Sequence, residues 1–441
     1  MISSFFKKTS ANTIKLISEG EAYYEQYLNL IKNSQKSIHL QTYIFEDDKF
    51  GRAVITELIG AAQRQVKVYV LVDSLGSLNF GEKPEKELLN AGVYFSRFNF
   101  VQFKWLGQWG RRLHHKILLA DNSYALIGGI NVISKSYKNE KVTPQLDFAV
   151  YIDGPATVDL TRYCQLIFSQ ASQKKINFSK DTILKNPNAE GVELKISIND
   201  WIYQRWQITR QYSVLTQAAK KDIIILNSYF FPRRKFMKQL VQAARRGVRV
   251  RLILPKISDW PSYVLATQYL YAYFLRNGVE IYQWKKSIMH GKLATIDNTW
   301  TSIGSFNLNY TGYQQNLEMN VDVYSGSFTE EINEILREII KNGCEKIEAA
   351  EFIEKAPVKI RLYRFFCYVI LQMVANLSIG LAFQEEARRN RYYKVFYIST
   401  GLLFFLLGIL GFLMLSWSGV PFFILSFLLL ILQIKLNNKN V

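Results

Sequence analysis

A motif that occurs twice with the same internal spacing constrains this chain more than any other feature. The first copy runs from His114 to Asn131 and the second from His290 to Asn307, and both have the form H-x-K-x4-D-x6-G-[GS]-x-N. Apolar residues fill the gaps, so each copy predicts a buried strand, a tight turn and a second strand. Residues two apart on a strand point to the same face, so the His and Lys of each copy project together. We therefore expect one site built from two halves.

The histidines of the chain gather in these motifs. Only four occur in the sequence, and three of them (His114, His115 and His290) lie in the two copies. The fourth, His39, lies in an ordinary strand pattern, which predicts a core residue. A lone His-x-Lys would carry little information, whereas six positions that recur at one spacing are specific enough to predict shared chemistry.

The duplication extends well beyond the motif. Strand-like and helix-like stretches alternate in both halves, which predicts an α/β sheet covered on both faces. Each stretch of the first half has a counterpart that precedes the second motif, so the repeat spans a whole domain. The matched stretches are 38–45 with 223–231, 61–72 with 243–254, and 89–95 with 275–281.

These matches predict the domain boundaries. We expect a first repeat over residues 1–173 and a second over residues 192–348. The polar stretch 174–191, which contains Pro187, is the predicted linker between them.

The C-terminal part has a different composition. Residues 357–394 form a predicted amphipathic, juxtamembrane segment, in which Arg361, Arg364, Gln372 and Asn376 interrupt a largely apolar helix pattern. Several of them fall on one side at helical spacing, which favours a helix lying in the membrane interface. A membrane-spanning helix over the same stretch is the alternative.

Residues 395–436 form a predicted transmembrane helical hairpin. The stretch 395–415 contains no charged residue and is long enough to cross a bilayer. The stretch 420–434 is shorter and gives a second span when it is extended back to Trp417; residues 416–419 would form the turn between the two spans. Basic residues flank both outer ends, which predicts that these ends and the catalytic body face the cytoplasm; they are Arg388, Arg389, Arg391, Lys394, Lys435 and Lys439.

Charge and cysteine content narrow the class of protein. The formal net charge is +19, which implies an anionic partner: nucleic acid, an anionic membrane or a phosphorylated substrate. The three cysteines are far apart and odd in number, so neither a zinc site nor a disulfide framework is expected. The N-terminal segment lacks the apolar region of a signal peptide.

The paired motifs predict phosphodiester chemistry. Lys116 and Lys292 can neutralise the non-bridging oxygens of one phosphoryl group, and Asn131 and Asn307 can donate hydrogen bonds to it. One imidazole can attack phosphorus while the other protonates the leaving oxygen and later deprotonates the incoming hydroxyl. Two lysines then stand where a metal could act, so we expect neither a metal nor another cofactor.

The duplicated motif makes the chain resemble the phospholipase D superfamily. Within it, the chain is most similar to bacterial cardiolipin synthases of the short form that lacks N-terminal membrane spans. The resemblance covers residues 13 to 347. The stretches that carry the narrower resemblance are Thr42–Phe45 with Asp48 and Gly51, Asp147 with Asp153–Pro155, and Ser228–Pro232.

This resemblance implies an architecture and residue roles. The expected fold is α/β: two fused phospholipase D-like α/β sandwich repeats with one shared active site, followed by the amphipathic helix and the transmembrane hairpin. His114 resembles the nucleophile and His290 the general acid and base, although the symmetry of the sequence allows the roles to be exchanged. An acidic residue downstream of each motif orients a histidine in this superfamily, and Asp147 and Glu318 match that position in the first and second halves.

Two further residues and two departures complete the comparison with the superfamily. Asp121 and Asp297 belong to the catalytic motif, where we expect them to brace the fold. Asn309 and Tyr310 stand where the family often has an Asp-Arg pair, which bears on the preference for acceptor or head group. The hydrophobic hairpin is also unusual for the short form.

The resemblance implies a membrane-bound phosphatidyltransferase. It would join two phosphatidylglycerol molecules through a phosphatidyl-histidine intermediate and release glycerol. The expected partners are phosphatidylglycerol and the membrane, with no nucleic acid, and the expected location is the bacterial cytoplasmic membrane. Hydrolysis to phosphatidic acid uses the same residues and stays an alternative; a membrane-anchored nuclease and an inactive lipid-binding scaffold are less favoured.

Overall fold

The computed structural model of this chain describes residues 6–99, 111–134, 137, 142–173, 191–200, 205–382 and 401. Almost all of the predicted linker and all but one residue of the predicted hairpin lie outside them.

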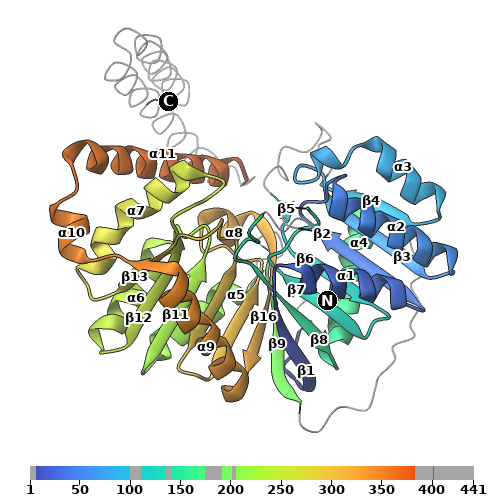
Figure 1. The fold of residues 1–441 in the computed structure, drawn as a ribbon, viewed down its shortest axis with the longest axis horizontal. Coiled ribbons are helices and arrows are strands. Elements are labelled where there is room, and N and C mark those ends of the chain that lie inside the picture. The colour runs from blue at the N-terminus through green and yellow to red at the C-terminus, as the bar shows by residue number, and fades with distance from the viewer. Residues whose placement is uncertain are drawn as a thin grey trace, which may run out of the picture. The chain divides into compact units, whose positions relative to one another are not determined.

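The described strands of the first half form one mixed sheet of seven strands, coloured from blue to green in Figure 1. Three parallel strands lie at one side and four strands in antiparallel pairs follow. In spatial order the strands are β4 (Tyr94–Phe98), β3 (Lys67–Asp73), β2 (Ser37–Thr42), β6 (Lys116–Ala120), β7 (Tyr124–Gly128), β8 (Phe148–Asp153) and β1 (Thr9–Ser18).

The second half repeats this order of strands. Its parallel strands are again followed by antiparallel ones. In spatial order they are β13 (Glu280–Trp284), β12 (Arg249–Pro255), β11 (Asp222–Asn227), β14 (Lys292–Ile296), β15 (Trp300–Gly304), β16 (Asn316–Tyr324) and β9 (Val192–Asp200). Two short strands, β17 (Cys344–Lys346) and β10 (Arg205–Trp206), pair with β13 and β9.

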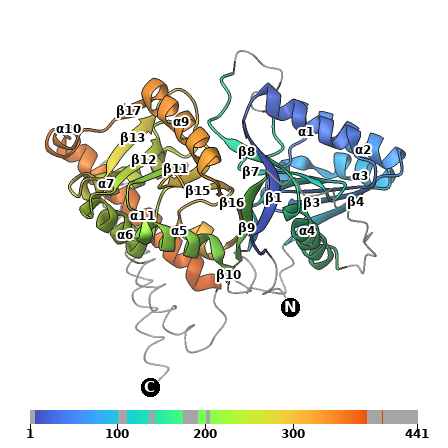
Figure 2. The ribbon, with the colours of Figure 1, turned by 90° about the horizontal axis from the view of Figure 1, so that it is seen from below.

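Helices cover both faces of each sheet (Figure 2). On the first sheet, α1 (Glu21–Asn33) and α2 (Lys49–Gln63) lie on one face and α4 (Ala156–Ser172) on the other. On the second, α5 (Gln207–Ala218) and α6 (Arg234–Arg245) lie opposite α9 (Gly326–Gly343). The remaining short elements are η2 (Leu78–Phe80), α3 (Glu82–Asn90), β5 (Arg112–Leu113), α8 (Tyr310–Gln314) and α10 (Ala349–Glu354), and the two longer helices are α7 (Pro261–Leu275) and α11 (Val358–Ala382). The repeated mixed α/β fold expected from the sequence is confirmed.

Local sequence explains why these helices form where they do. In α2, the side chain of Asp48 accepts a hydrogen bond from the backbone N–H of Gly51 and caps the helix. Phe50, Val54 and Leu58 then recur at helical spacing and are all fully buried. The helix therefore begins at a capped end and packs its apolar face on the sheet.

The two halves share a hydrophobic core. One cluster of buried residues combines strands of both sheets with α4 and α9, and it includes Ile127, Val150, Ile303 and Val321. Strand β1 joins the halves further, since it pairs with β8 of its own half and, near Thr9, with β9 of the other. Packing of this kind holds the two motifs in fixed relation to each other.

By packing, the chain divides into two compact units, and most of both repeats belongs to the first of them. The first unit comprises Met1–Val101, Arg111–Asp259 and Tyr273–Phe352. The second comprises Gln102–Gly110, Trp260–Ala272 and Ile353–Val441, of which residues 260–272, 353–382 and 401 are described.

Helix α11 lies within the predicted juxtamembrane segment. It is a single helix of 25 residues. Among the described residues, no helix combines the length and the apolar character that crossing a membrane requires. The predicted transmembrane hairpin falls on residues that the structure does not describe, so it stays a prediction.

Candidate active site

The imidazole of His114 lies at the end of β5, just before β6, and faces the other half of the molecule. Its Nδ1 is 2.9 Å from Oε2 of Glu318, which is fully buried in β16 of the second repeat. A carboxylate that binds Nδ1–H fixes the tautomer, so that Nε2 carries the lone pair of the neutral ring. Nε2 of His114 is therefore the nitrogen that is set up to act on a substrate.

His290 has the mirror arrangement. Its Nδ1 is 2.7 Å from Oδ2 of Asp147, a buried carboxylate of the first repeat. Each of the two predicted orienting carboxylates thus holds a histidine, and each holds the histidine of the other half. The order of the sequence suggests that Asp147 orients His114 and that Glu318 orients His290, and this pairing is wrong.

Backbone hydrogen bonds explain this exchange of partners. Strand β5 pairs in parallel with the start of β16, and the N–H of His114 donates to the carbonyl of Leu317 at 3.0 Å. In the other half, the N–H groups of His290 and Gly291 donate to the carbonyl of Leu146 at 3.0 and 2.8 Å. Each histidine is thereby held next to the residue that precedes the opposite carboxylate.

The two lysines lie beside the histidines, as period-2 alternation along a strand predicts. Nζ of Lys116 donates to the carbonyl oxygen of His114 at 2.5 Å, and Nζ of Lys292 makes the same contact with the carbonyl of His290. An ammonium has three donors. One of them anchors each lysine to the backbone of its own histidine, which holds the ammonium group beside the imidazole.

The two predicted phosphate-binding asparagines are oriented by their carbonyl oxygens. Oδ1 of Asn131 accepts from the N–H of Ile44 at 3.1 Å, and Oδ1 of Asn307 accepts from Oγ of Ser228 at 3.3 Å. Oγ of Ser228 also lies 3.3 Å from the carbonyl oxygen of His290, so its single proton is shared between two acceptors and the hydroxyl links Asn307 to the histidine backbone. With the oxygen side of each amide engaged, the NH₂ side is the one available to an anion.

Two tyrosines that we did not predict as site residues complete each half. The ring of Tyr43 lies 4.9 Å from the ring of His114, and that of Tyr229 lies edge-on to His290 at 6.1 Å. Lys116 and Lys292 lie over the same two rings, at 5.4 and 6.0 Å from their centroids. The repeat offered a signal, because Thr42-Tyr43 and Ser228-Tyr229 stand at matching positions in the two halves.

The two carboxylates are held differently. Glu318 accepts hydrogen bonds from Ser305 Oγ at 2.5 Å and from Asn316 Nδ2 at 3.0 Å in addition to the histidine. At the position of Ser305, the first half has Gly129, and a Cβ there would lie 2.3 Å from Oδ1 of Asp147. In the Gly-Gly copy, Gly129 thus leaves space for the carboxylate of Asp147. In the Gly-Ser copy, Ser305 donates a hydrogen bond to Glu318.

Burial and the neighbouring cations set the protonation of the histidines. Burial lowers the pKa of His114, an effect that Glu318 opposes and that Lys116 and Lys292 reinforce. Burial, followed by the charge of Lys292, lowers the pKa of His290 to about 4, although Asp147 pulls it upward. Lysines of both halves act on both histidines, so the two motifs form one electrostatic site.

The remaining charged groups respond in the same way. Burial lowers the pKa of Lys116 to about 7. Burial alone would raise the pKa of Glu318, but His114 and Lys116 outweigh it and hold that pKa below its usual value. Asp147 follows the same pattern, with His290 and Lys292 as the cations that keep its pKa low. Both carboxylates are therefore ionised at neutral pH.

Asp121 and Asp297 lie at the far end of the motif strands. Asp121 accepts hydrogen bonds from the backbone N–H groups of residues 35, 36 and 37, at 2.7 to 3.2 Å. Asp297 makes the matching contacts with residues 220, 221 and 222. Both aspartates have positive φ, 52° and 51°, in the tight turns of their strand pairs. These contacts place them as braces between turn and strand.

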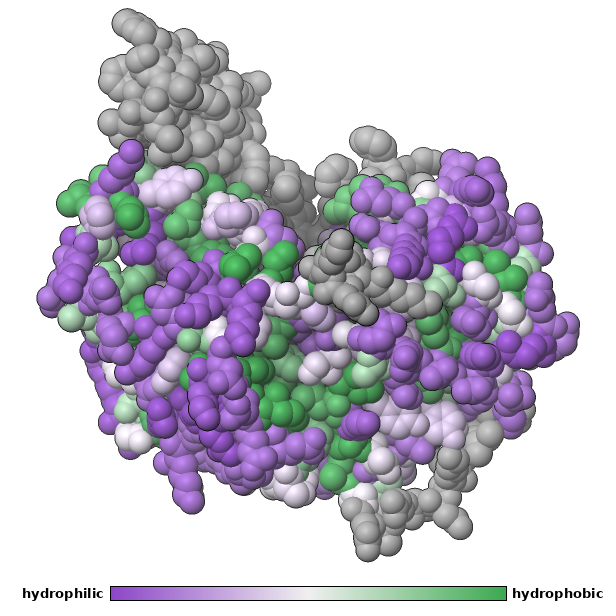
Figure 3. All heavy atoms as spheres, in the orientation of Figure 1, coloured by the Kyte–Doolittle hydropathy of each residue, from purple (hydrophilic) through white to green (hydrophobic). Residues whose placement is uncertain are grey.

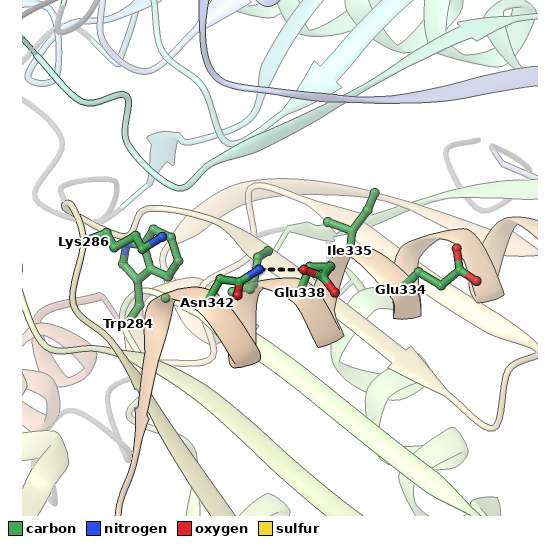
Figure 4. A pocket seen from close by; sticks show the side chains of 8 residues that line it. Trp284, Lys286, Glu334, Ile335, Glu338 and Asn342 are labelled. Atoms are coloured by element: carbon green, nitrogen blue, oxygen red, sulfur yellow. Dashed lines mark hydrogen bonds between the residues drawn. The ribbon is translucent and has the colours of Figure 1, made fainter.

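A separate hollow lies beside α9 in the second repeat (Figure 4). It has a volume of about 400 Å³ and is lined by Trp284, Lys286, Ile335 and Glu338, among others. None of the predicted site residues lines it. Among the described residues there is also no cluster of three or more His, Cys, Asp or Glu side chains suited to a metal ion, and the expectation of a cofactor-free site stays a prediction.

Comparison with known proteins identifies relatives along most of the chain. The model of a family described as cardiolipin synthase, PLD-like domain matches residues 27–171 and 213–340. Cardiolipin synthase B of Salmonella typhimurium is 31% identical over 341 residues, which cover 76% of this chain and 82% of that protein. Cardiolipin synthase 1 of Staphylococcus epidermidis is 27% identical over 360 residues, or 80% and 72% of the two chains.

A solved structure shares the fold. The crystal structure of phosphatidylserine synthase from Haemophilus influenzae superposes with a TM-score of 0.63 and covers 82% of this chain and 94% of that one. The sequence identity is 13%, so this likeness concerns the architecture alone.

Proposed function

Because this chain belongs to the cardiolipin synthase family of phospholipase D-like enzymes, we propose that it joins two phosphatidylglycerol molecules into cardiolipin and releases glycerol. One observation supports this most: two imidazoles, each held by a buried carboxylate of the opposite repeat, share a site with two lysines. Such a site is suited to forming and then resolving a covalent phosphoryl intermediate. The lysines and asparagines of both halves would bind the phosphate oxygens.

In the first proposed step, Nε2 of His114 attacks the phosphorus of the donor lipid. The bond between phosphorus and the head-group glycerol oxygen breaks, and His290 gives its Nε2 proton to that oxygen. Glycerol leaves, and the phosphatidyl group stays on His114 through a phosphorus–nitrogen bond. Lys116 and Lys292 offset the negative charge that the oxygens carry in the transition state.

The second step reverses these roles. His290, now neutral, takes the proton from a head-group hydroxyl of the acceptor phosphatidylglycerol. The acceptor oxygen attacks phosphorus, the phosphorus–nitrogen bond breaks, and His114 returns to its neutral state. Water in place of the lipid hydroxyl would give phosphatidic acid, so the activity depends on which hydroxyl reaches the intermediate.

The protonation states fit this sequence of steps. The pKa of His114 is below its ordinary value, so a neutral nucleophile is present at pH 7. His290 must instead start protonated, whereas burial and Lys292 lower its pKa in the absence of substrate. A bound phosphate anion would counter the lysine charges and raise that pKa, which couples the acid to substrate binding. Asp147 would stabilise the resulting imidazolium.

The proposal includes attachment to the membrane. Residues 395–436 would form a transmembrane hairpin that anchors the enzyme in the bacterial cytoplasmic membrane, with the catalytic unit on the cytoplasmic side. The uncharged stretch 395–415 and its basic flanks support this.

Product analysis tests the activity. Purified enzyme receives phosphatidylglycerol in vesicles, and lipids and free glycerol are quantified. We expect cardiolipin and glycerol in equal amounts, and neither product from His114→Ala or His290→Ala. His39→Gln is the matched control, because this histidine is buried in β2 outside the site, and it should retain activity.

Two other outcomes would contradict the proposal. Phosphatidic acid as the sole product would make the enzyme a hydrolase. Histidine-dependent cleavage of DNA without lipid turnover would make it a nuclease. Rapid denaturation at early times, followed by peptide mapping, should find the phosphatidyl group on His114; label on His290 would exchange the two roles.

A further inference from the structure

The second compact unit carries an exposed surface in which apolar and basic side chains are mixed. We define the α7–α11 face as the exposed large apolar and basic residues of the second unit that lie just before α7, in α7 and in the N-terminal half of α11. They are Trp260, Tyr269, Val358, Lys359, Ile360, Arg361, Leu362, Tyr363 and Phe365. Figure 3 shows apolar and hydrophilic atoms side by side along the upper left edge, where α11 runs.

The apolar members of this face are unusually exposed. The exposed fractions are 68% for Val358, 50% for Leu362 and 51% for Trp260. Val358, Leu362 and Phe365 follow each other at spacings of four and three residues, so they form one stripe along α11. A stripe of large apolar side chains normally faces a core, and here it faces outward.

Helix α7 adds a second line of aromatic side chains. The ring of Tyr269 packs at 5.5 Å from Phe365 and at 4.6 Å from Tyr368, and Nε of Arg364 donates to Gln268 at 3.0 Å. Within the second unit, α7 and α11 therefore form one layer, and its rim carries Tyr and Trp rings. Such rings, apolar in body and polar at one tip, suit the boundary between lipid and water.

The internal repeat allows the composition of α7 to be compared with that of the equivalent helix in the first half. The corresponding helix of the first half is α3, which connects β3 to β4 as α7 connects β12 to β13. Five of the nine residues of α3 are charged, whereas α7 has 15 residues and no charge. Equivalent helices of one duplicated fold thus differ in composition, and the uncharged one is the helix that packs with α11.

Charge indicates what covers this face. In residues 353–382 there are four basic side chains (Lys355, Lys359, Arg361 and Arg364) and one acidic one (Glu354), a net charge of 4 − 1 = +3. Residues 260–272 contain no charge. The partner of this face must bury its apolar side chains and neutralise its positive charge. An anionic bilayer does both, since the acyl boundary contacts apolar side chains and the head groups carry negative charge.

We propose that the α7–α11 face docks on the surface of an anionic phospholipid bilayer. This inference rests on the proposed function, because the substrate lipid is itself part of that bilayer. Val358, Leu362 and Phe365 would lie at the level of the acyl boundary while Lys359 and Arg361 contact lipid phosphates. Docking of this kind is independent of the proposed transmembrane hairpin and would hold the second unit against the lipid.

Depth measurements on the full-length chain test the proposal. Cys164, Cys344 and Cys367 are replaced, and a fluorophore is attached to Leu362→Cys or, as a matched control, to Val214→Cys. Val214, on α5 of the catalytic unit, is 51% exposed, against 50% for Leu362. In vesicles with phosphatidylglycerol and brominated phospholipids, we expect quenching at position 362 several times stronger than at position 214. Phosphatidylcholine vesicles should weaken it.

Equal quenching at positions 362 and 214 would overturn the proposal. So would a label at 362 that is shielded from aqueous quenchers but untouched by brominated lipid. That outcome would indicate that a second copy, or another segment of this chain, covers the face.

Activity provides a second test. The double variant Val358→Glu/Leu362→Glu should lose about tenfold of its turnover on phosphatidylglycerol vesicles, since two acidic groups replace two apolar contacts at the boundary. Turnover in detergent micelles should change less than twofold, and Val214→Glu should leave both unchanged. Equal losses in vesicles and micelles would contradict docking. Failure of the proposed function looks different, because His114→Ala should abolish turnover in both media and leave the quenching intact.

Discussion

Asp147 of the first repeat binds His290 of the second, with Oδ2 and Nδ1 2.7 Å apart, and the backbone on both sides of this contact is paired as well. The matching contact between Glu318 and His114 runs in the opposite direction. Neither repeat therefore contains an oriented histidine of its own. A single repeat would have a nucleophile without its carboxylate, so the catalytic unit of this enzyme is the pair.

Replacing Asp147 by Asn should lower kcat by about a hundredfold to ten-thousandfold with little change in KM. The amide preserves the shape of the side chain, but it cannot stabilise the imidazolium that His290 must form, and it favours the wrong tautomer. Steady-state turnover of phosphatidylglycerol measures the effect, with the melting temperature as a check on folding. A kcat within threefold of the wild type would show that Asp147 does not act on His290 in the reaction.

Gly129→Ala and Ser305→Ala change the same motif position in the two repeats, and we expect the two substitutions to lower kcat by different amounts. The new Cβ at residue 129 would lie 2.3 Å from Oδ1 of Asp147, so the carboxylate must shift from the position in which it binds His290. Loss of the Ser305 hydroxyl removes one donor of three from Glu318. We expect kcat to fall at least tenfold more in Gly129→Ala than in Ser305→Ala, measured in parallel assays. The reverse order would mean that the hydroxyl matters more than the space beside Asp147.

Asp121→Ala should reduce stability much more than activity. The carboxylate accepts hydrogen bonds from the N–H groups of residues 35, 36 and 37, and losing these contacts should lower the free energy of unfolding by about 2–4 kcal/mol. Denaturant titration measures this change. Turnover per folded molecule should stay within threefold of the wild type, and a large drop at unchanged stability would instead assign Asp121 to the chemistry.

The acid limb of the pH profile of kcat/KM should lie below pH 6.5. The nucleophile must be neutral, since a proton on Nε2 occupies the attacking lone pair, and burial lowers the pKa of His114 below 6.5. The acid limb therefore shifts to lower pH by the same amount. Glu318 opposes this shift, so Glu318→Gln should move the limb lower still. An acid limb above pH 6.5 in the wild type would contradict a depressed histidine pKa.

Much of the fold was predictable because each stretch has a clear local pattern. The strand, tight turn and second strand predicted for the first motif copy are β6 (Lys116–Ala120), the turn at Asp121 and β7 (Tyr124–Gly128). Their apolar periodicity and the turn residues around them are sufficient for this. The duplicated motif also indicated one shared site, since six positions recur at a single spacing.

The partners of Asp147 and Glu318 were not predictable in the same way. Sequence order places each carboxylate closest to its own motif, but contact across the repeats depends on the pairing of β5 with β16 and on the bridge between Leu146 and Met289. These pairings join residues far apart in the chain, and no local pattern encodes them. The sequence predicted Ser305 only as a position of the motif, since its role as a donor depends on the position of Glu318 in the fold.

Strand β1 has a consequence for synthesis on the ribosome. It pairs with β8 from Thr13 to Ser18, but its first residues pair with β9 at Leu194 and Val192. The backbone groups at the start of β1 can therefore form their strand pairing only after about 180 further residues have been synthesised and β9 has emerged. We expect nascent chains stopped before residue 192 to be cleaved by protease near Thr9, and longer ones to be protected there. The start of β1 is thus synthesised first but is among the last segments to reach its final strand pairing.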